Sequence, residues 1–222
     1  MSAIENAVIL AAGAGTRLGM GKPKCLVEVH GRTVLDYQLE LLRSVRTVHL
    51  VVGYQENDVI EIARSLREDL VIVRNPSYMT RSNFYSLFLG ARTFKKPFIS
   101  LDGDLLMGQQ EFGRFLEACR LARDNDFLLG VTEAKTDDAV FVHLDERGFI
   151  LRFSRSERAK YEWTGPIYIG SRACIWRQDA YDGYQFEFFS QFERLKAFPI
   201  DLFEIDTPND LALTEQFFKF EA

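Results

Sequence analysis

Residues 7–18 read Ala7-Val-Ile-Leu-Ala-Ala-Gly13-Ala-Gly15-Thr16-Arg17-Leu18, an apolar run that ends in a glycine loop, and Lys24 follows six residues later. Because glycine has no Cβ, Gly13 and Gly15 allow the backbone to turn sharply and to bring its N–H groups against phosphate oxygens. Arg17 offers a planar fork to a phosphate group, and Lys24 offers a compact positive charge. The stretch therefore predicts a buried strand followed by a nucleotide-binding loop.

Two commoner glycine loops do not fit this stretch. The dinucleotide-binding loop has the pattern G-x-G-x-x-G, and here the third glycine, Gly19, comes one residue late. The P-loop needs Gly-Lys followed by Ser or Thr, whereas Gly21-Lys22 is followed by Pro23, which has neither a hydroxyl nor an N–H. An ordinary strand-to-helix connection is the structural alternative, but it leaves the arginine and the lysine beside the loop unexplained.

Composition indicates a single enzyme-sized domain. The chain has 222 residues, 47% of them hydrophobic, and a formal net charge of -5. This acidity, without a basic stripe, argues against nucleic acid as the main partner. Cys25, Cys119 and Cys174 are scattered, which is typical of reduced thiols and not of a disulfide framework or a zinc site. The first apolar run breaks at Gly13, too early for a membrane span or a signal peptide, so we expect a cytoplasmic protein without a membrane partner.

The order of the elements predicts an α/β fold. Short apolar runs alternate with segments of helical periodicity, which indicates βαβ units. We expect a Rossmann-like, mixed but mostly parallel sheet with helices on both faces, in one domain. The predicted strands cover 8–10, 48–52, 71–73, 98–101 and 127–131, and the predicted helices cover 34–44, 58–67, 83–93 and 111–123. In the second half we expect a hairpin over 140–144 and 149–153, a strand over 166–169 and a helix over 172–181.

Two acidic motifs follow predicted strands or precede a helix. Asp102-Gly-Asp104 comes directly after an apolar strand, where a carboxylate can bind Mg²⁺, a cation that prefers oxygen ligands. Taken alone, the motif is equally well explained as a turn with solvated carboxylates. In Asp206-Thr207-Pro208, the threonine and the proline predict a well-capped helix start, which leaves Asp206 unexplained.

The glycine loop from Leu10 to Leu18, together with Pro23-Lys24-Cys-Leu26, resembles the signature of the nucleotidyltransferases. These enzymes join a nucleoside triphosphate to a phosphorylated small molecule, and they include sugar-phosphate nucleotidylyltransferases and bacterial phosphocholine cytidylyltransferases. The segment Asn83-Phe-Tyr-Ser-Leu87 resembles the phosphocholine and aminoethylphosphonate cytidylyltransferase branch. An asparagine amide both donates and accepts hydrogen bonds, so Asn83 is a candidate reader of a pyrimidine edge.

The resemblance implies a role for each motif. Arg17 and Lys24 are the implied catalytic residues, and Asp104 and Asp206 the implied Mg²⁺ ligands. The implied contacts to the nucleotide, with CTP expected, come from Leu10, Ala11, Ala12, Gly13, Ala14, Gly15, Thr16, Arg17, Lys24, Ser82, Asn83 and Asp102. For the acceptor, aromatic rings beside a carboxylate suit a cationic amine, and the candidates are Tyr85, Glu162, Trp163 and Tyr168. We expect residues 1–105 to bind the nucleotide, residues 106–222 to bind a small phosphorylated acceptor, and the chain to be a candidate homodimer.

Two other functions remain open at this point. A hexose-1-phosphate nucleotidylyltransferase that uses UTP or GTP would carry the same glycine loop and carboxylates. A regulatory protein on this fold would bind the nucleotide but release no pyrophosphate. Assays of pyrophosphate release with different nucleotides and acceptors separate all three.

Overall fold

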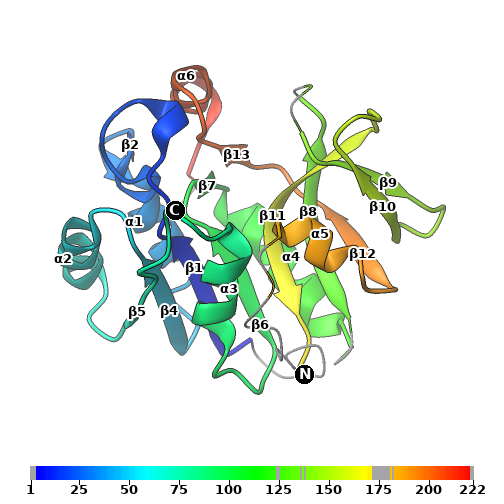
Figure 1. The fold of residues 1–222 in the computed structure, drawn as a ribbon, viewed down its shortest axis with the longest axis horizontal. Coiled ribbons are helices and arrows are strands. Elements are labelled where there is room, and N and C mark those ends of the chain that lie inside the picture. Colours follow the sequence, from blue (N-terminus) through cyan, green and yellow to red (C-terminus); the bar gives the residue numbers. More distant parts are fainter. Residues whose placement is uncertain are drawn as a thin grey trace.

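A nine-stranded mixed sheet forms the centre of the molecule (Figure 1). The computed structural model describes residues 4–123, 126–135, 137, 139–171, 181 and 183–220. The strands of this sheet are β1 (Asn6–Ala11), β4 (Thr47–Val52), β5 (Val71–Arg74), β6 (Phe98–Asp102), β8 (Phe127–Glu133), β9 (Phe141–Leu144), β10 (Ile150–Ser154), β11 (Tyr161–Ile169) and β12 (Leu195–Pro199). Short strand pairs lie beside it, β2 (Glu28–Val29) with β3 (Arg32–Thr33) and β7 (Leu105–Leu106) with β13 (Phe203–Glu204).

The sheet is mixed and mostly parallel, as predicted. Strands β5, β4, β1 and β6 form a parallel array, and β12 is parallel to β8. Within this nine-stranded sheet, β10 and β11 are antiparallel to the other described strands. Strand β11 pairs with both β6 and β8, so β8 is parallel to β6 but not its neighbour. A crossover helix is about 10 Å wide whereas neighbouring strands lie about 4.8 Å apart, so the connection can pass over one strand position.

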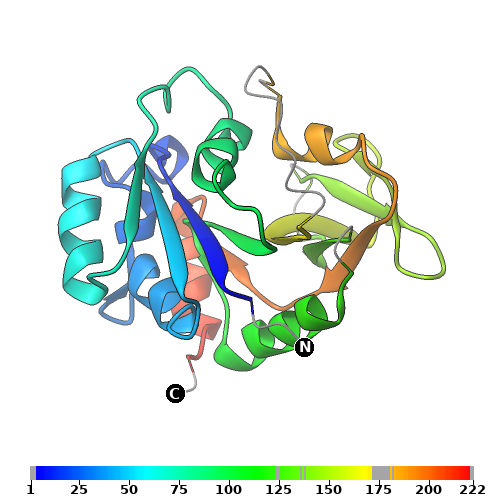
Figure 2. The same ribbon diagram turned by 90° about the horizontal axis from the view of Figure 1, so that it is seen from below.

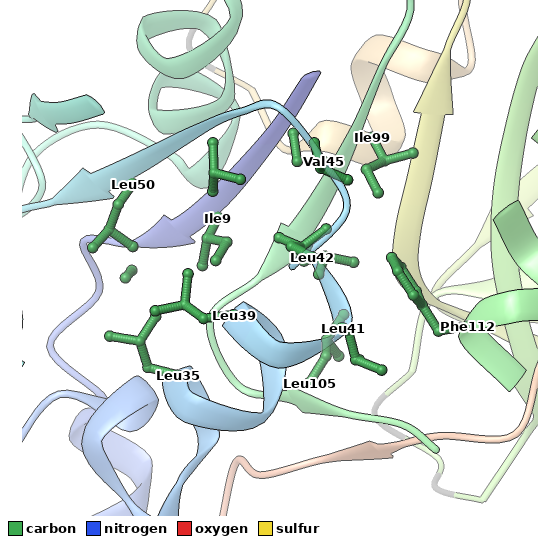
Figure 3. Close-up of a cluster of buried hydrophobic side chains, with 14 of the residues drawn as sticks. Ile9, Leu35, Leu39, Leu41, Leu42, Val45, Leu50, Ile99, Leu105 and Phe112 are labelled. Atoms are coloured by element: carbon green, nitrogen blue, oxygen red, sulfur yellow. The ribbon is translucent and has the colours of Figure 1, made fainter. Parts of the chain in front are cut away.

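Helices cover both faces of the sheet, which confirms the predicted layering. Helices α1 (Val34–Leu41), α2 (Glu56–Leu66) and α4 (Gln109–Leu121) pack against one face, and α3 (Asn83–Ala91) and α5 (Gln185–Phe189) against the other (Figure 2). Side chains of β1 alternate accordingly, since Ile9 faces α1 while Val8 faces α3. Figure 3 shows the first of these cores around Ile9, Leu35 and Phe112.

The second half contains elements that the sequence did not reveal. The predicted hairpin is confirmed as β9 and β10, and the strand expected over 166–169 is the end of the longer β11. Helix α5 and strands β12 and β13 were not predicted, because their segments are short and rich in aromatic residues without a clear period. Most of the helix expected over 172–181 lies outside the described residues. Helix α6 (Pro208–Phe217) begins where Thr207 predicted, with the threonine hydroxyl accepting from the Asp210 N–H.

The predicted thiols can be located in part. Cys25 and Cys119 are free and buried, and Cys174 lies outside the described residues. Within the described ranges, no helix combines the length and the apolar character needed to cross a bilayer.

Gly90 sets the packing of α3 on the sheet. A Cβ added to Gly90 would lie 2.5 Å from Val8 Cγ1 and 2.8 Å from Val51 Cγ2. We therefore expect Gly90→Ala to lower the free energy of unfolding by about 1–3 kcal/mol, because overpacking forces the helix off the sheet. The measurement is equilibrium unfolding in urea.

Gly113, in the middle of α4, is the matched control, because a Cβ there meets no atom within 4 Å. Gly113→Ala should raise the free energy of unfolding by about 0.5–1 kcal/mol through the better helix propensity of alanine. Equal effects of the two substitutions would contradict the packing role of Gly90.

Candidate active site

A cleft of about 360 Å³ lies at the carboxyl ends of β1 and β6. Ligand sites of α/β sheets occur at this edge. The walls come from the glycine loop after β1, the turn after β6, the start of α3 and the segment after β13. The lining residues are Leu10, Ala11, Ala12, Gly13, Gly15, Thr16, Arg17, Lys24, Cys25, Tyr78, Arg81, Ser82, Asn83, Ser86, Asp102, Gly103, Asp104, Glu204 and Asp206. Of the predicted nucleotide contacts, Ala14 is not among these residues.

Two glycines let the loops of the cleft approach one another. Gly15 has φ +60°, and a Cβ on it would lie 2.8 Å from Lys24 Cγ, so the lysine passes directly over the loop. Gly103 donates its N–H to Leu10 O at 2.9 Å, and a Cβ there would lie 2.7 Å from the same oxygen. The turn that carries the carboxylates is therefore held against the end of β1.

Lys24 joins the two predicted metal ligands. Its Nζ lies 2.7 Å from Asp104 Oδ2 and also contacts Asp206 Oδ1, while Arg17 reaches Asp206 Oδ2 at 2.6 Å. Burial alone would lower the pKa of Lys24, but the Asp104 and Asp206 carboxylates outweigh it and hold the pKa above its usual value. Lys24 is therefore a permanent cation, largely withdrawn from solvent. The Arg17 side chain is 63% exposed, so its ion pair is weak and the guanidinium is free to move to a phosphate.

Glu204 is a site residue that the sequence analysis missed. Carboxylate oxygens of Asp104, Glu204 and Asp206 all lie within 4.8 Å of one another. Burial of the Glu204 carboxyl group raises its pKa, and the Asp104 and Asp206 charges raise it further. The residue as a whole is exposed to solvent, which moderates the shift. Glu204 and Asp206 flank the buried Ile205, and this period of two is the signal that could have revealed it.

The carboxylate cluster fits a divalent cation. Asp104 Oδ1 is buried and has no hydrogen-bond partner among the described residues. Such an orphaned carboxylate oxygen beside two further carboxylates is the donor set that Mg²⁺ prefers. Asp104, Glu204 and Asp206 could therefore hold the ion that the sequence predicted.

Gln38, on α1, fixes the turn between Asp102 and Leu105. Its Nε2 donates to Asp102 O at 2.8 Å and to Leu105 O at 2.9 Å, and the residue is fully buried. Ile205 donates its N–H to Asp104 O at 3.0 Å, which ties the turn to the segment that carries Asp206. The relative position of the carboxylates thus depends on backbone hydrogen bonds from separate elements.

Asp102 differs electrostatically from its neighbours in the turn. Burial and then the Asp104 carboxylate raise the pKa of Asp102 to about 7. The side-chain amide of Gln185 lowers the pKa of Asp102. This effect is small, because Gln185 Nε2 does not reach hydrogen-bond geometry with any described residue. This carboxyl is therefore a poorer metal ligand than Asp104, although it lines the same cleft.

The start of α3 and the residue before its N-cap line the cleft with Ser82, Asn83 and Arg81. Asn83 is the first residue of the helix and is exposed to the cleft. Ser82 is the N-cap residue, but its hydroxyl does not cap the helix and instead donates to Gly183 O at 2.6 Å. The Arg81 guanidinium lies 4.4 Å from the centroid of the Tyr85 ring.

The predicted acceptor residues lie outside the cleft lining. Tyr168 is 2% exposed and packs in the core on the α4 side of the sheet. Glu162 is buried between β8 and β9. Trp163 packs edge-on against Phe189 with ring centroids 5.8 Å apart, on the face that α5 covers.

Residues 7–166 match the family model described as the MobA-like NTP transferase domain. The chain belongs to this family. This membership agrees with the resemblance seen in the glycine loop and places that loop at the start of the matched region. The matched region contains the glycine loop, the carboxylate turn after β6 and the strands of the sheet as far as the middle of β11.

Individual relatives of this MobA-like domain cover different shares of the chain. The CTP:phosphoglutamine cytidylyltransferase of Campylobacter jejuni is 31% identical over 115 residues, 50% of this chain and 45% of that protein. The chain spans less than half the length of the curated relatives that it matches. The solved inositol-1-phosphate CTP transferase from T. maritima has a TM-score of 0.79 at 20% identity and covers 100% of this chain and 99% of its own. The CTP:phosphocholine cytidylyltransferase of Streptococcus pneumoniae has a TM-score of 0.75 at 18% identity, over 97% and 100% of the two chains. At these identities the two structures show a common fold.

Proposed function

We propose that this protein is a Mg²⁺-dependent cytidylyltransferase that transfers CMP from CTP to a small phosphorylated or phosphonate acceptor and releases pyrophosphate. The observation that carries the proposal is the cleft in which Lys24 and Arg17 meet the Asp104, Glu204 and Asp206 carboxylates beside a glycine loop. A regulatory nucleotide-binding protein has no need for this combination of cations and carboxylates.

The reaction is an in-line displacement. An anionic oxygen of the acceptor attacks the α-phosphorus of CTP, the bond from the α-phosphorus to the bridging oxygen breaks, and pyrophosphate leaves with that electron pair. Since the acceptor is already an anion, no strong general base is required, and catalysis rests on positioning and charge neutralisation. Lys24 and Arg17 neutralise the charge that grows on the α-phosphate and on the departing pyrophosphate.

The charge balance of the cleft supports a metal requirement. The lining holds the four carboxyl groups of Asp102, Asp104, Glu204 and Asp206 beside the cationic groups of Arg17, Lys24 and Arg81, so the side chains supply no excess of positive charge for a triphosphate. Mg²⁺ held by Asp104, Glu204 and Asp206 would supply the missing positive charge and polarise the phosphates. Lys24 contacts the same carboxylates, so a metal ion bound there would compete with Lys24 for them.

The choice of CTP draws on the names of the relatives and on α3. The Campylobacter relative and the two solved neighbours are named for CTP and for phosphorylated acceptors. We extend this to the present chain because Asn83, at the start of α3, offers an amide to the cleft. The proposal includes nucleotide binding by residues 1–105, acceptor binding by residues 106–222, a cytoplasmic location and a homodimer. Tyr85, Glu162, Trp163 and Tyr168 lie outside the cleft lining and are left out of the proposed acceptor contacts.

The decisive experiment is a screen of pyrophosphate release. CTP, UTP, GTP and ATP should each be paired with phosphocholine, phosphoethanolamine, aminoethylphosphonate, inositol 1-phosphate and hexose 1-phosphates, with and without Mg²⁺. We expect the highest kcat/KM with CTP and a small acceptor, and no turnover after the metal is chelated. Faster turnover of a hexose 1-phosphate with UTP or GTP would refute the proposal, as would nucleotide binding without pyrophosphate release from any pair.

Asn83→Ala should erode the preference for CTP over UTP. An amide that pairs with one base edge in the nucleotide complex is left unpaired by the other base, so its loss should reduce the ratio of the two kcat/KM values by about 10-fold. Asn209→Ala, at an exposed asparagine of α6 away from the cleft lining, is the matched control. An unchanged ratio in Asn83→Ala would remove Asn83 from the base contacts.

A further inference from the structure

One carboxylate oxygen at the start of α6 accepts three hydrogen bonds. Asp210 Oδ2 accepts from the Thr207 N–H at 2.8 Å, from the Thr207 hydroxyl at 2.8 Å and from the Asp206 N–H at 3.2 Å. In a capping box this side chain needs to reach only the N–H of the N-cap residue, which here is Thr207. The bond from Asp206 is therefore additional, and it ties Asp210 to the backbone of a proposed metal ligand.

The Asp210 carboxylate stands on an anchored turn of the helix. The Asp210 N–H donates to Thr207 Oγ1 at 3.3 Å, and Asp210 O accepts from the Thr214 hydroxyl at 2.6 Å. Thr214 is fully buried, and its own carbonyl accepts from the Phe218 N–H at 2.8 Å. Phe218, which is 5% exposed, packs edge-on against Tyr37 of α1 with ring centroids 5.3 Å apart. Both ends of α6 are thus fixed to the rest of the molecule.

The backbone of Asp206 is held through the N–H groups of two successive residues. The Ile205 N–H donates to Asp104 O at 3.0 Å, and the Asp206 N–H donates to Asp210 Oδ2. The first bond joins the segment to the turn after β6, and the second joins it to α6. The Asp206 carboxylate oxygens lie within 4.8 Å of those of Asp104 and Glu204, and this spacing depends on where the Asp206 backbone is held.

We propose that Asp210 is a positioning residue of the metal site, and that it holds the Asp206 backbone so that the Asp206 carboxylate meets those of Asp104 and Glu204. This inference rests on the proposed function, because that function assigns a divalent cation to the three carboxylates. Asp210 itself is outside both this carboxylate group and the cleft lining. It acts through Asp206.

The test measures binding of Mn²⁺ by its paramagnetic resonance signal, without nucleotide or acceptor. Asp210→Ala should weaken Mn²⁺ binding by about 10–100-fold, the range for loss of a partner that orients a metal ligand. Asp210→Asn should keep the wild-type affinity, because the amide oxygen can accept the same hydrogen bonds although the charge is gone. Equal weakening in the two variants would assign the effect to the charge of Asp210 and overturn the positioning role.

Thr207→Val separates positioning from helix capping. This variant removes the hydroxyl that accepts from the Asp210 N–H, and so the cap of α6, but leaves the Asp206 N–H and its acceptor in place. It should bind Mn²⁺ as the wild type does, although its melting temperature falls. Weakening as large as that in Asp210→Ala would show that the stability of α6 governs the site, and would refute the inference.

Asp145→Ala is the matched control at a distance from the cleft. Asp145 Oδ1 also accepts two backbone hydrogen bonds, from the Arg147 and Phe149 N–H groups in the turn between β9 and β10, and Asp145 is outside the cleft lining. Its loss removes a comparable local constraint, so Mn²⁺ binding should not change. A 10-fold weakening here would mean that metal binding reports general loosening of the fold, which would overturn the specific role of Asp210.

Hydrogen exchange of the wild-type protein tests the bond itself, whether or not Asp210→Ala folds. The Asp206 N–H should exchange more slowly than the Asn209 N–H, which lies in the first turn of α6, where N–H groups have no intrahelical acceptor. Equal exchange rates of the two amides would contradict the hold on Asp206.

The outcomes separate this inference from the proposed function. If the wild-type protein binds Mn²⁺ and releases pyrophosphate from CTP, but Asp210→Ala binds Mn²⁺ as tightly, Asp210 has no positioning role and the cytidylyltransferase stands. If the wild-type protein binds no Mn²⁺ and turns over without a metal, the metal dependence in the proposed function fails, and the inference fails with it.

Discussion

Asp104→Asn is expected to lower kcat by about 10³-fold while leaving the fold intact, since a metal ligand contributes several kcal/mol to stabilising the transition state and each 1.36 kcal/mol is tenfold in rate. The substitution keeps the volume of the side chain but removes the charge that faces Lys24. Asp206→Asn should act in the same way, because Asp206 contacts the same lysine. The measurement is kcat at saturating CTP and acceptor over a range of Mg²⁺ concentrations.

Asp201→Asn provides the control, because Asp201 is an exposed carboxylate on the same C-terminal segment and outside the cleft lining. Direct binding of Mn²⁺, followed by its paramagnetic resonance signal, should weaken in the two site variants and not in the control. Near-normal turnover in both Asp104→Asn and Asp206→Asn would remove the carboxylates from the metal site.

Lys24→Ala should lower kcat by about 10²–10³-fold and change the KM for CTP much less, because its charge acts mainly on the transition state. The structure adds a second expectation. Without the lysine, Asp104 and Asp206 lose their common counter-ion, so the thermal stability of the variant should depend on Mg²⁺ more strongly than that of the wild-type protein.

Lys22→Ala removes the same charge two positions earlier, outside the cleft lining, and serves as the matched control. Calorimetric melting curves with and without Mg²⁺ measure the second effect. A variant with unchanged kcat would place Lys24 outside the reaction, and a variant whose stability responds to Mg²⁺ as the wild type does would argue against its role as a counter-ion.

Much of the site could be predicted because its parts follow local rules. The glycine loop is visible as a contiguous pattern, and Asp102-Gly-Asp104 follows a strand whose apolar run is unbroken. The capped start of α6 is also local, since Thr207, Pro208 and Asp210 are close in sequence. The structure brings Asp104 and Asp206 to the same lysine ammonium group, which no local rule provides.

The features that escaped prediction depend on partners distant in the chain. Glu204 lies on β13, a strand of only two residues that exists because it pairs with β7. Ser82 occupies the N-cap position of α3, but its hydroxyl donates to the Gly183 carbonyl from the far half of the chain. The place of β11 between β6 and β8 is likewise set by pairing on both of its edges.

The bridge made by Lys24 has a consequence for the order of events during synthesis. Lys24 and Asp206 are 182 positions apart in sequence, and the segment with Asp206 is held by the Ile205 N–H on Asp104 O. During synthesis, the ribosome therefore adds the glycine loop and Asp104 to the chain long before it adds Asp206, the second carboxylate that Lys24 contacts. Under the proposed mechanism, which uses Asp206 as a metal ligand, the site is assembled only after that late segment has docked.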